Sequence, residues 1–207
     1  MKLREKQTLM TRGIIKQTAL GLFCAGGIEL TDMSQIAEQA GVSRRTLYHH
    51  FKDKEELAAE IYLENLQKMF GQLVPDFDYR QPVSSILSIL DKYLLLKQQS
   101  EALLYYDAIF NVYYSTLAKN PADLPDYGSM MAQGYERLMR LEADGMSAEE
   151  QAQWREKLFM STHLWFSYLQ KSVVAAHQRG GEVTEADVAE DLRYKEFIIK
   201  AVGKGRC

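Results

Sequence analysis

Glycine and proline occur in clusters along this chain of 207 residues, and the long segments between them have a helical hydrophobic period. The first segment, roughly residues 8 to 25, has Ile15 and Phe23 on one face and ends at the helix stop Gly26-Gly27. No run of alternating β-branched residues is long enough to form a strand. The chain is therefore predicted to be all-α, with about nine helices.

Composition restricts the class of protein further. Hydrophobic residues make up 46% of the chain, enough for a sizeable core, but no apolar run approaches the ~18 to 20 residues of a membrane span. The two cysteines, Cys24 and Cys207, make neither a disulfide framework nor a zinc ligand set. We therefore expect a cytoplasmic protein with no metal and no cofactor.

Charge is distributed unevenly along the chain. Residues 1–57 contain nine Lys or Arg against seven Asp or Glu, whereas residues 58–207 contain sixteen against twenty-one. The basic residues are densest at the N-terminus, where a single acidic residue, Glu5, accompanies Lys2, Arg4, Lys6, Arg12 and Lys16. A small basic module on a larger acidic body indicates a polyanionic partner for the module, although a solvated basic arm would give the same pattern.

Two short helices joined by a tight turn are predicted within this module. Asp32 caps the first helix, Gly41 permits the turn, and Ser43 caps the second helix. Leu47 and Phe51 are four residues apart, so both can face inward from the second helix. This arrangement matches the helix-turn-helix plan, which places the second helix in the DNA major groove.

The outer face of that second helix carries groups that suit DNA, because arginine can donate two hydrogen bonds to guanine. The residues predicted to reach base edges are Arg44, Arg45, Tyr48 and His49. The residues better placed for phosphates are Thr46, His50 and Lys54. Two alternatives stay open, since Tyr48 could be mainly a packing residue and His49 could be solvated.

The segment LTDMSQIAEQAGVSRRTLYHHFKDKEEL, preceded by TALGLF, closely resembles the N-terminal signature of tetracycline-repressor (TetR) family regulators. The resemblance covers about residues 10 to 60 and rests on A-G-V-S, T-L-Y-x-H-F and K-x-K-E-x-L. It implies a homodimer whose three N-terminal helices bind DNA and whose other helices bind an effector. By position it implies base contacts from Arg44, Arg45 and Tyr48, and phosphate contacts from Thr31, Thr46, His50 and Lys54. Arg45 departs from the family pattern, which often has a small residue there.

The proline-containing stretch VPDFDYRQP is the only boundary that the composition indicates between the basic module and the acidic body. The predicted domains are a DNA-binding domain at 1–57 and a helical effector-binding and dimerisation domain at 58–207. Further helices are predicted from Val83, from Ser100, over Tyr127–Ala143, from the capping box at Ser147 to Gly180, and after Thr184.

A carboxylate interrupts an apolar stripe in the body. Leu103, Asp107, Phe110 and Tyr114 share a narrow arc at helical spacing. A buried carboxylate must be paired, protonated or exposed to a cavity, so Asp107 is either a satisfied core residue or part of a pocket for a cationic or hydroxyl-bearing ligand. The residues predicted to line such a pocket are Tyr106, Asp107, Phe110, Tyr114, His163 and Phe166.

The long helix after Ser147 has two apolar stripes, and the last helix is also amphipathic. Helices that are apolar on two sides must be buried on two sides, which predicts a four-helix bundle with a second copy. The predicted interface residues are Leu158, Trp165, Leu169, Leu192 and Ile199. The alternative is a monomer whose last helix folds back over the core.

These features together predict a ligand-responsive repressor that binds an inverted-repeat operator as a homodimer. The alternative within the same fold is a ligand-independent or architectural DNA-binding protein. An enzyme is not expected, because the chain lacks the G-x-G-x-x-G, P-loop, G-x-S-x-G and H-E-x-x-H patterns.

Overall fold

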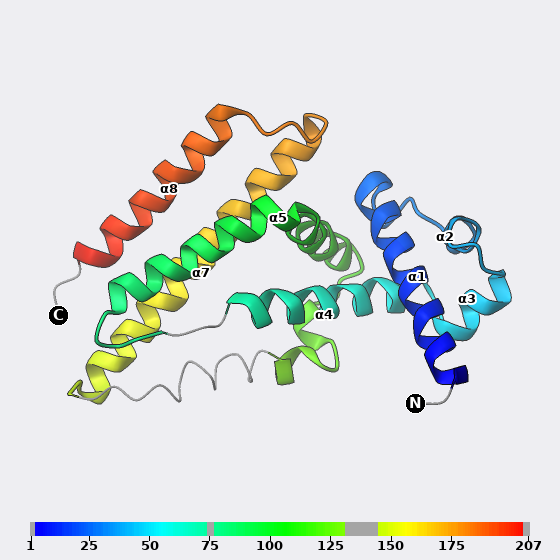
Figure 1. The fold of residues 1–207 in the computed structure, drawn as a ribbon, viewed down its shortest axis with the longest axis horizontal. Helices are drawn as coiled ribbons and strands as arrows, with labels where there is room; N and C mark the ends of the chain where they lie inside the picture. The colour runs from blue at the N-terminus through cyan, green and yellow to red at the C-terminus, as the bar shows by residue number, and fades with distance from the viewer. Residues whose placement is uncertain (1–2, 74–76, 131–144, 205–207) are drawn as a thin grey trace. The chain divides into compact units, whose positions relative to one another are not determined.

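A computed structural model describes residues 3–73, 77–130 and 145–204, and in these ranges the regular structure is helical, as predicted (Figure 1). The helices are α1 (Leu3–Gly26), α2 (Met33–Gln39), α3 (Arg44–His50), α4 (Lys54–Leu73), α5 (Pro82–Thr116), the 3₁₀ turn η1 (Pro121–Asp123), α7 (Ala148–Gln178) and α8 (Glu185–Lys204). Most of the helix predicted over Tyr127–Ala143 lies outside the described residues. None of the helices in these ranges is both long enough and apolar enough to cross a membrane.

The chain divides into two compact units. The first lies within Met1–Gln67 and Tyr105–Gly128, and the second lies within Lys68–Leu104 and Ser129–Cys207. This division differs from the predicted boundary after residue 57, because α4 continues in the first unit as far as Gln67 and the last part of α5, from Tyr105, joins it there. The helix break predicted at Ser100 is confirmed, since this residue has non-helical backbone angles (φ −148°, ψ 47°) inside α5.

The first unit is built around large side chains that α1 to α5 bury completely. Phe23, Leu47, Phe51 and Tyr106 are each 0% exposed. The ring of Tyr106 stacks on Phe23 with centroids 6.2 Å apart, and its hydroxyl donates a hydrogen bond to the Ala58 carbonyl at 2.9 Å. Burial of each such side chain stabilises the folded state by about 1.5 to 3 kcal/mol. Leu47 and Phe51, which were predicted to face inward, therefore hold α3 firmly in this unit.

The ends of the short helices are fixed by the predicted caps. The carboxylate of Asp32 accepts hydrogen bonds from the backbone N–H groups of Ser34 at 2.7 Å and Gln35 at 2.9 Å, which lower its pKa. The Ser43 hydroxyl accepts from the Thr46 N–H at 3.0 Å. Gly41 lies between them with φ 66°, a left-handed conformation that favours glycine.

The second unit contains the first part of α5 together with α7 and α8. Figure 1 shows α7 and α8 as neighbouring antiparallel helices joined by a short turn. In that turn Gly180 and Gly181 both have positive φ, at 86° and 82°. The predicted capping box at Ser147 is present, and Thr184 caps α8 by accepting from the Asp187 N–H at 3.3 Å.

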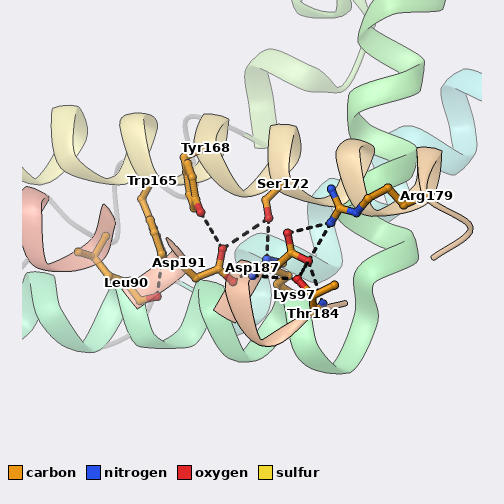
Figure 2. Close-up of polar contacts among 9 residues, drawn as sticks. All are labelled: Leu90, Lys97, Trp165, Tyr168, Ser172, Arg179, Thr184, Asp187 and Asp191. Carbon is orange, nitrogen blue, oxygen red and sulfur yellow. Dashed lines mark hydrogen bonds and ion pairs between the residues drawn. The ribbon is translucent and has the colours of Figure 1, made fainter. Parts of the chain in front are cut away.

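A buried polar network joins all three helices of this unit (Figure 2). The Lys97 ammonium on α5 donates to Asp191 Oδ2 on α8 at 2.5 Å and to the Ser172 hydroxyl on α7 at 2.8 Å. Tyr168 donates to the other carboxylate oxygen, Asp191 Oδ1, at 3.0 Å. Beside the network, the indole N–H of Trp165 donates to the Leu90 carbonyl at 2.9 Å. The core of this unit is therefore fixed by directional bonds as well as by apolar contact.

Candidate nucleic-acid interface

Helix α3 presents a basic and aromatic face to solvent. Leu47 and Phe51 point into the core, whereas Arg44, Arg45 and His49 are exposed and Tyr48 is 54% exposed. All four side chains predicted to read bases are therefore available on one short helix.

The two arginines lie in the first turn of α3, at the positive end of the helix dipole. Cations at this end of a helix are disfavoured by about 0.3 to 1 kcal/mol. Local stability therefore does not explain why Arg44 and Arg45 occur there, whereas an external anion or a guanine edge would stabilise both.

Two residues predicted to bind phosphate are engaged within the protein. Thr31 is only 4% exposed, and its hydroxyl donates to the Gly27 carbonyl at 2.8 Å. This hydroxyl therefore completes the turn after α1, and the phosphate contact predicted for Thr31 stays a prediction. Lys54 donates to the carbonyls of Glu29 at 2.7 Å and Thr31 at 2.8 Å, and partial burial lowers its pKa. Its ammonium retains one N–H for a phosphate.

Thr46 and His50 lie on the flanks of α3 and are half-buried. The Thr46 hydroxyl is 2.8 Å from that of Ser43 and so extends the cap of the helix. Burial lowers the pKa of His50, and the positive charges of His49 and Arg12 lower it further. A neutral His50 ring can donate one hydrogen bond to a phosphate but adds no charge.

The basic N-terminal segment does not act as one surface. Arg12 and Lys16, which were counted among the charges for a polyanion, turn toward carboxylates of α4. Arg12 pairs with both oxygens of Glu60, and Lys16 pairs with Glu60 and Glu64. The basic surface is therefore smaller than the charge count indicated, although Arg4 and Lys6 of α1 are exposed, as are Arg44 and Arg45 of α3.

The six predicted pocket residues are divided between the two units. Tyr106, Asp107, Phe110 and Tyr114 are buried in the first unit, where Phe110 stacks on Tyr114 with centroids 4.8 Å apart. His163 and Phe166 belong to α7 in the second unit.

His163 is exposed and stacks on the half-exposed ring of Phe159, with centroids 5.1 Å apart, and its place in a pocket stays a prediction. Phe166 is half-buried and contacts Tyr93 edge to face, with centroids 5.6 Å apart.

Three of the predicted interface residues belong to the interior of the second unit. Leu158 is 4% exposed and Trp165 and Leu169 are 0% exposed, so this stripe of α7 is covered by α5 and α8 of the same chain. Assigning these residues to a contact with a second copy was wrong. Leu192 is 53% exposed and Ile199 is half-buried, so both remain available.

Several residues that organise these units were not predicted. Lys97 and Asp191 lie 94 residues apart, and Arg12 and Glu60 lie 48 apart, so no sequence window contains either pair. Such residues could have been found as polar residues inside an apolar stripe. Asn65 is an example, because it lies with Ile61 and Tyr62 on the buried side of α4.

The first three helices and the start of α4 form a helix-turn-helix module of the kind that inserts its second helix into DNA. Residues 15–61 match the family described as bacterial regulatory proteins, tetR family. The N-terminal module of this chain is therefore a TetR-type DNA-binding domain, and relatives that share this likeness are described as transcriptional regulators.

Two curated relatives illustrate the likeness in sequence. Over 121 residues the chain is 31% identical to the HTH-type transcriptional repressor KstR2 of Mycolicibacterium smegmatis, covering 58% of this chain and 56% of that protein. It is 38% identical over 85 residues to the HTH-type transcriptional regulator AcrR of Shigella flexneri, covering 41% and 39%. The alignments thus span about half of the first relative and two fifths of the second.

The likeness of fold extends over nearly the whole chain. A TetR family transcription regulator from Marinobacter aquaeolei VT8 covers 97% of this chain and 98% of its own, with a TM-score of 0.62. At 15% identity this comparison shows a shared fold alone.

Proposed function

We propose that the protein is a transcriptional repressor that binds double-stranded DNA by inserting α3 into the major groove. The observation that carries this proposal is the outward face of α3, where Arg44, Arg45, Tyr48 and His49 are exposed while Leu47 fixes the helix from below. Arginine next to a guanine edge is the commonest specific contact in such complexes. Repression, rather than activation, is supported by the description of KstR2.

We further propose that the protein binds DNA as a homodimer through the outer faces of α7 and α8. These faces carry large apolar side chains that are 44% to 67% exposed. They are Phe159, Met160 and Leu164 on α7, and Val188, Leu192 and Phe197 on α8. Because α7 and α8 are antiparallel neighbours, two copies related by a two-fold axis would bury both faces in a four-helix bundle.

In vitro selection of genomic fragments tests both proposals. We expect recovery of fragments that share an inverted repeat with half-sites about 34 to 36 Å apart, or a multiple of one helical turn, because the protein's two-fold axis is imposed on its DNA. Light scattering should give twice the chain mass of 23.8 kDa. Recovery no better than that of random fragments would contradict DNA recognition, and a mass near 23.8 kDa would contradict the dimer.

We propose in addition that a small-molecule effector binds near Asp107 in the first unit. Asp107 is 3% exposed and accepts a hydrogen bond from Asn111 Nδ2 at 3.1 Å. Burial raises the pKa of Tyr62 and of Tyr127, and the charge of Asp107 raises both further, so two phenols lie near this carboxylate. These groups would suit an aromatic ligand that carries a hydroxyl or a cation.

A thermal-shift screen with hydroxylated and cationic aromatic compounds tests this proposal. A compound present at about 100 times its Kd should stabilise the wild type by about 2.7 kcal/mol and should release selected DNA. Asp107→Asn should reduce the shift. Equal stabilisation of both proteins by every active compound would remove Asp107 from the site, and no active compound would favour the ligand-independent alternative.

A further inference from the structure

Arg12 of α1 joins three elements of the first unit through a single guanidinium group. Its Nε donates to Glu60 Oε1 on α4 at 2.9 Å, and its Nη2 pairs with the second oxygen of the same carboxylate. Its Nη1 donates to the backbone carbonyl of His50 at 2.6 Å. All three nitrogens are therefore used within the protein, although this residue lies in the basic segment that would otherwise be assigned to DNA.

The carbonyl that Arg12 binds belongs to the last residue of the recognition helix. Helix α3 has only seven residues, and its final carbonyls have no partner within the helix. The guanidinium carbon of Arg12 also lies 4.2 Å from the ring centroid of Phe51, the C-cap residue of α3. Since so short a helix is marginal on its own, external contacts of this kind decide where its C-terminal end lies.

The carboxylate partner of Arg12 is Glu60, which belongs to α4. Glu60 also accepts a hydrogen bond from Lys16 at 3.0 Å, one turn further along α1. The side chains of Arg12 and Glu60 are 28% and 27% exposed, so water reaches the pair only in part. A bidentate arginine–carboxylate pair in this setting has a defined geometry, which a lysine could not reproduce.

We propose that Arg12 is a positioning residue for DNA recognition, which fixes the C-terminal end of α3 to α4 through Glu60. The inference rests on the proposed DNA-binding function. It assigns Arg12 a role distinct from Arg44 and Arg45, because Arg12 orients the helix and does not contact DNA.

The test compares Arg12→Lys with the wild type, first without DNA. Amide hydrogen exchange should become faster at residues 47–51, while α2 should exchange as before. With DNA, the ratio of affinities for selected and random duplex should fall by about tenfold, the order expected for a lost hydrogen bond to a charged group. The salt dependence of binding should not change, because no phosphate contact is removed.

Two further variants make the outcome decisive. Glu60→Gln should reproduce the effects of Arg12→Lys, because it weakens the same pair from α4. The matched control is Lys119→Gln, which removes an ion pair with Glu55 in the same unit without touching α3 and should change neither readout. Faster exchange spread evenly over α1, α2 and α4 would indicate general destabilisation and overturn the inference, as would a reduced salt slope.

The exchange measurement separates this inference from the proposed function. If the wild type fails to prefer any DNA sequence, the proposed function fails, yet exchange at residues 47–51 still reports on Arg12. If the wild type does prefer a sequence and Arg12→Lys changes neither exchange nor preference, only the positioning role is overturned.

Discussion

Replacing Asp191 by alanine is expected to lower the free energy of unfolding by about 3 to 5 kcal/mol, because removing one partner of a buried ion pair leaves the other uncompensated. The Lys97 side chain is 7% exposed and the Asp191 side chain 6%. Without this carboxylate, Lys97 would retain the Ser172 hydroxyl, and Tyr168 would lose the acceptor that it has in Figure 2. A neutral hydroxyl cannot replace a carboxylate as the partner of a buried ammonium.

Urea denaturation at a fixed protein concentration measures this loss. The matched control is Asp91→Ala, which removes the partner of Lys195 and so breaks a second contact between α5 and α8. Asp91 is 58% exposed, and pairs of this kind contribute about 0 to 1 kcal/mol. The double variant Lys97→Met, Asp191→Leu should recover most of the stability, since apolar residues of similar volume often replace a buried pair without loss. Equally small losses in the free energy of unfolding for Asp191→Ala and Asp91→Ala would contradict the claim that the buried Lys97–Asp191 pair stabilises the second unit.

Changing both Arg44 and Arg45 to alanine is expected to remove most of the preference for the selected sequence. Each bidentate contact to guanine discriminates by about 1 to 3 kcal/mol, so the two together should account for roughly 2 to 6 kcal/mol if they act independently. Competition between labelled selected duplex and unlabelled random duplex measures the preference. The double variant Lys68→Ala, Arg193→Ala, which likewise removes two exposed positive charges but from α4 and α8, is the control for net charge. Equal losses on both duplexes would mean that the two arginines hold phosphates only.

Features that depend on neighbouring residues could be predicted from the sequence. The caps at Asp32, Ser43 and Ser147 are all confirmed, because a side chain that caps a helix reaches backbone N–H groups only two or three residues away. The inward direction of Leu47 and Phe51 followed from helical spacing alone.

Features that depend on distant residues could not be predicted. Helix α7 has two apolar stripes, and periodicity does not tell which of them its own unit covers. In the structure the stripe that contains Trp165 is buried and the stripe that contains Phe159 is exposed. The interface had been predicted on the stripe of Trp165. Likewise, the ammonium of Lys54 and the hydroxyl of Thr31 have the chemistry of phosphate ligands, but backbone carbonyls of the turn after α1 engage both.

The central claim, that α3 reads base edges in the major groove, is tested most directly by dimethyl sulfate footprinting on the selected DNA. The reagent methylates guanine N7, the major-groove acceptor that a bidentate arginine would occupy. We expect wild-type protein to protect guanine N7 in both half-sites, and the variant lacking Arg44 and Arg45 to lose this protection at concentrations that still saturate the DNA. Guanines that remain as reactive under saturating wild-type protein as in free DNA would contradict the claim.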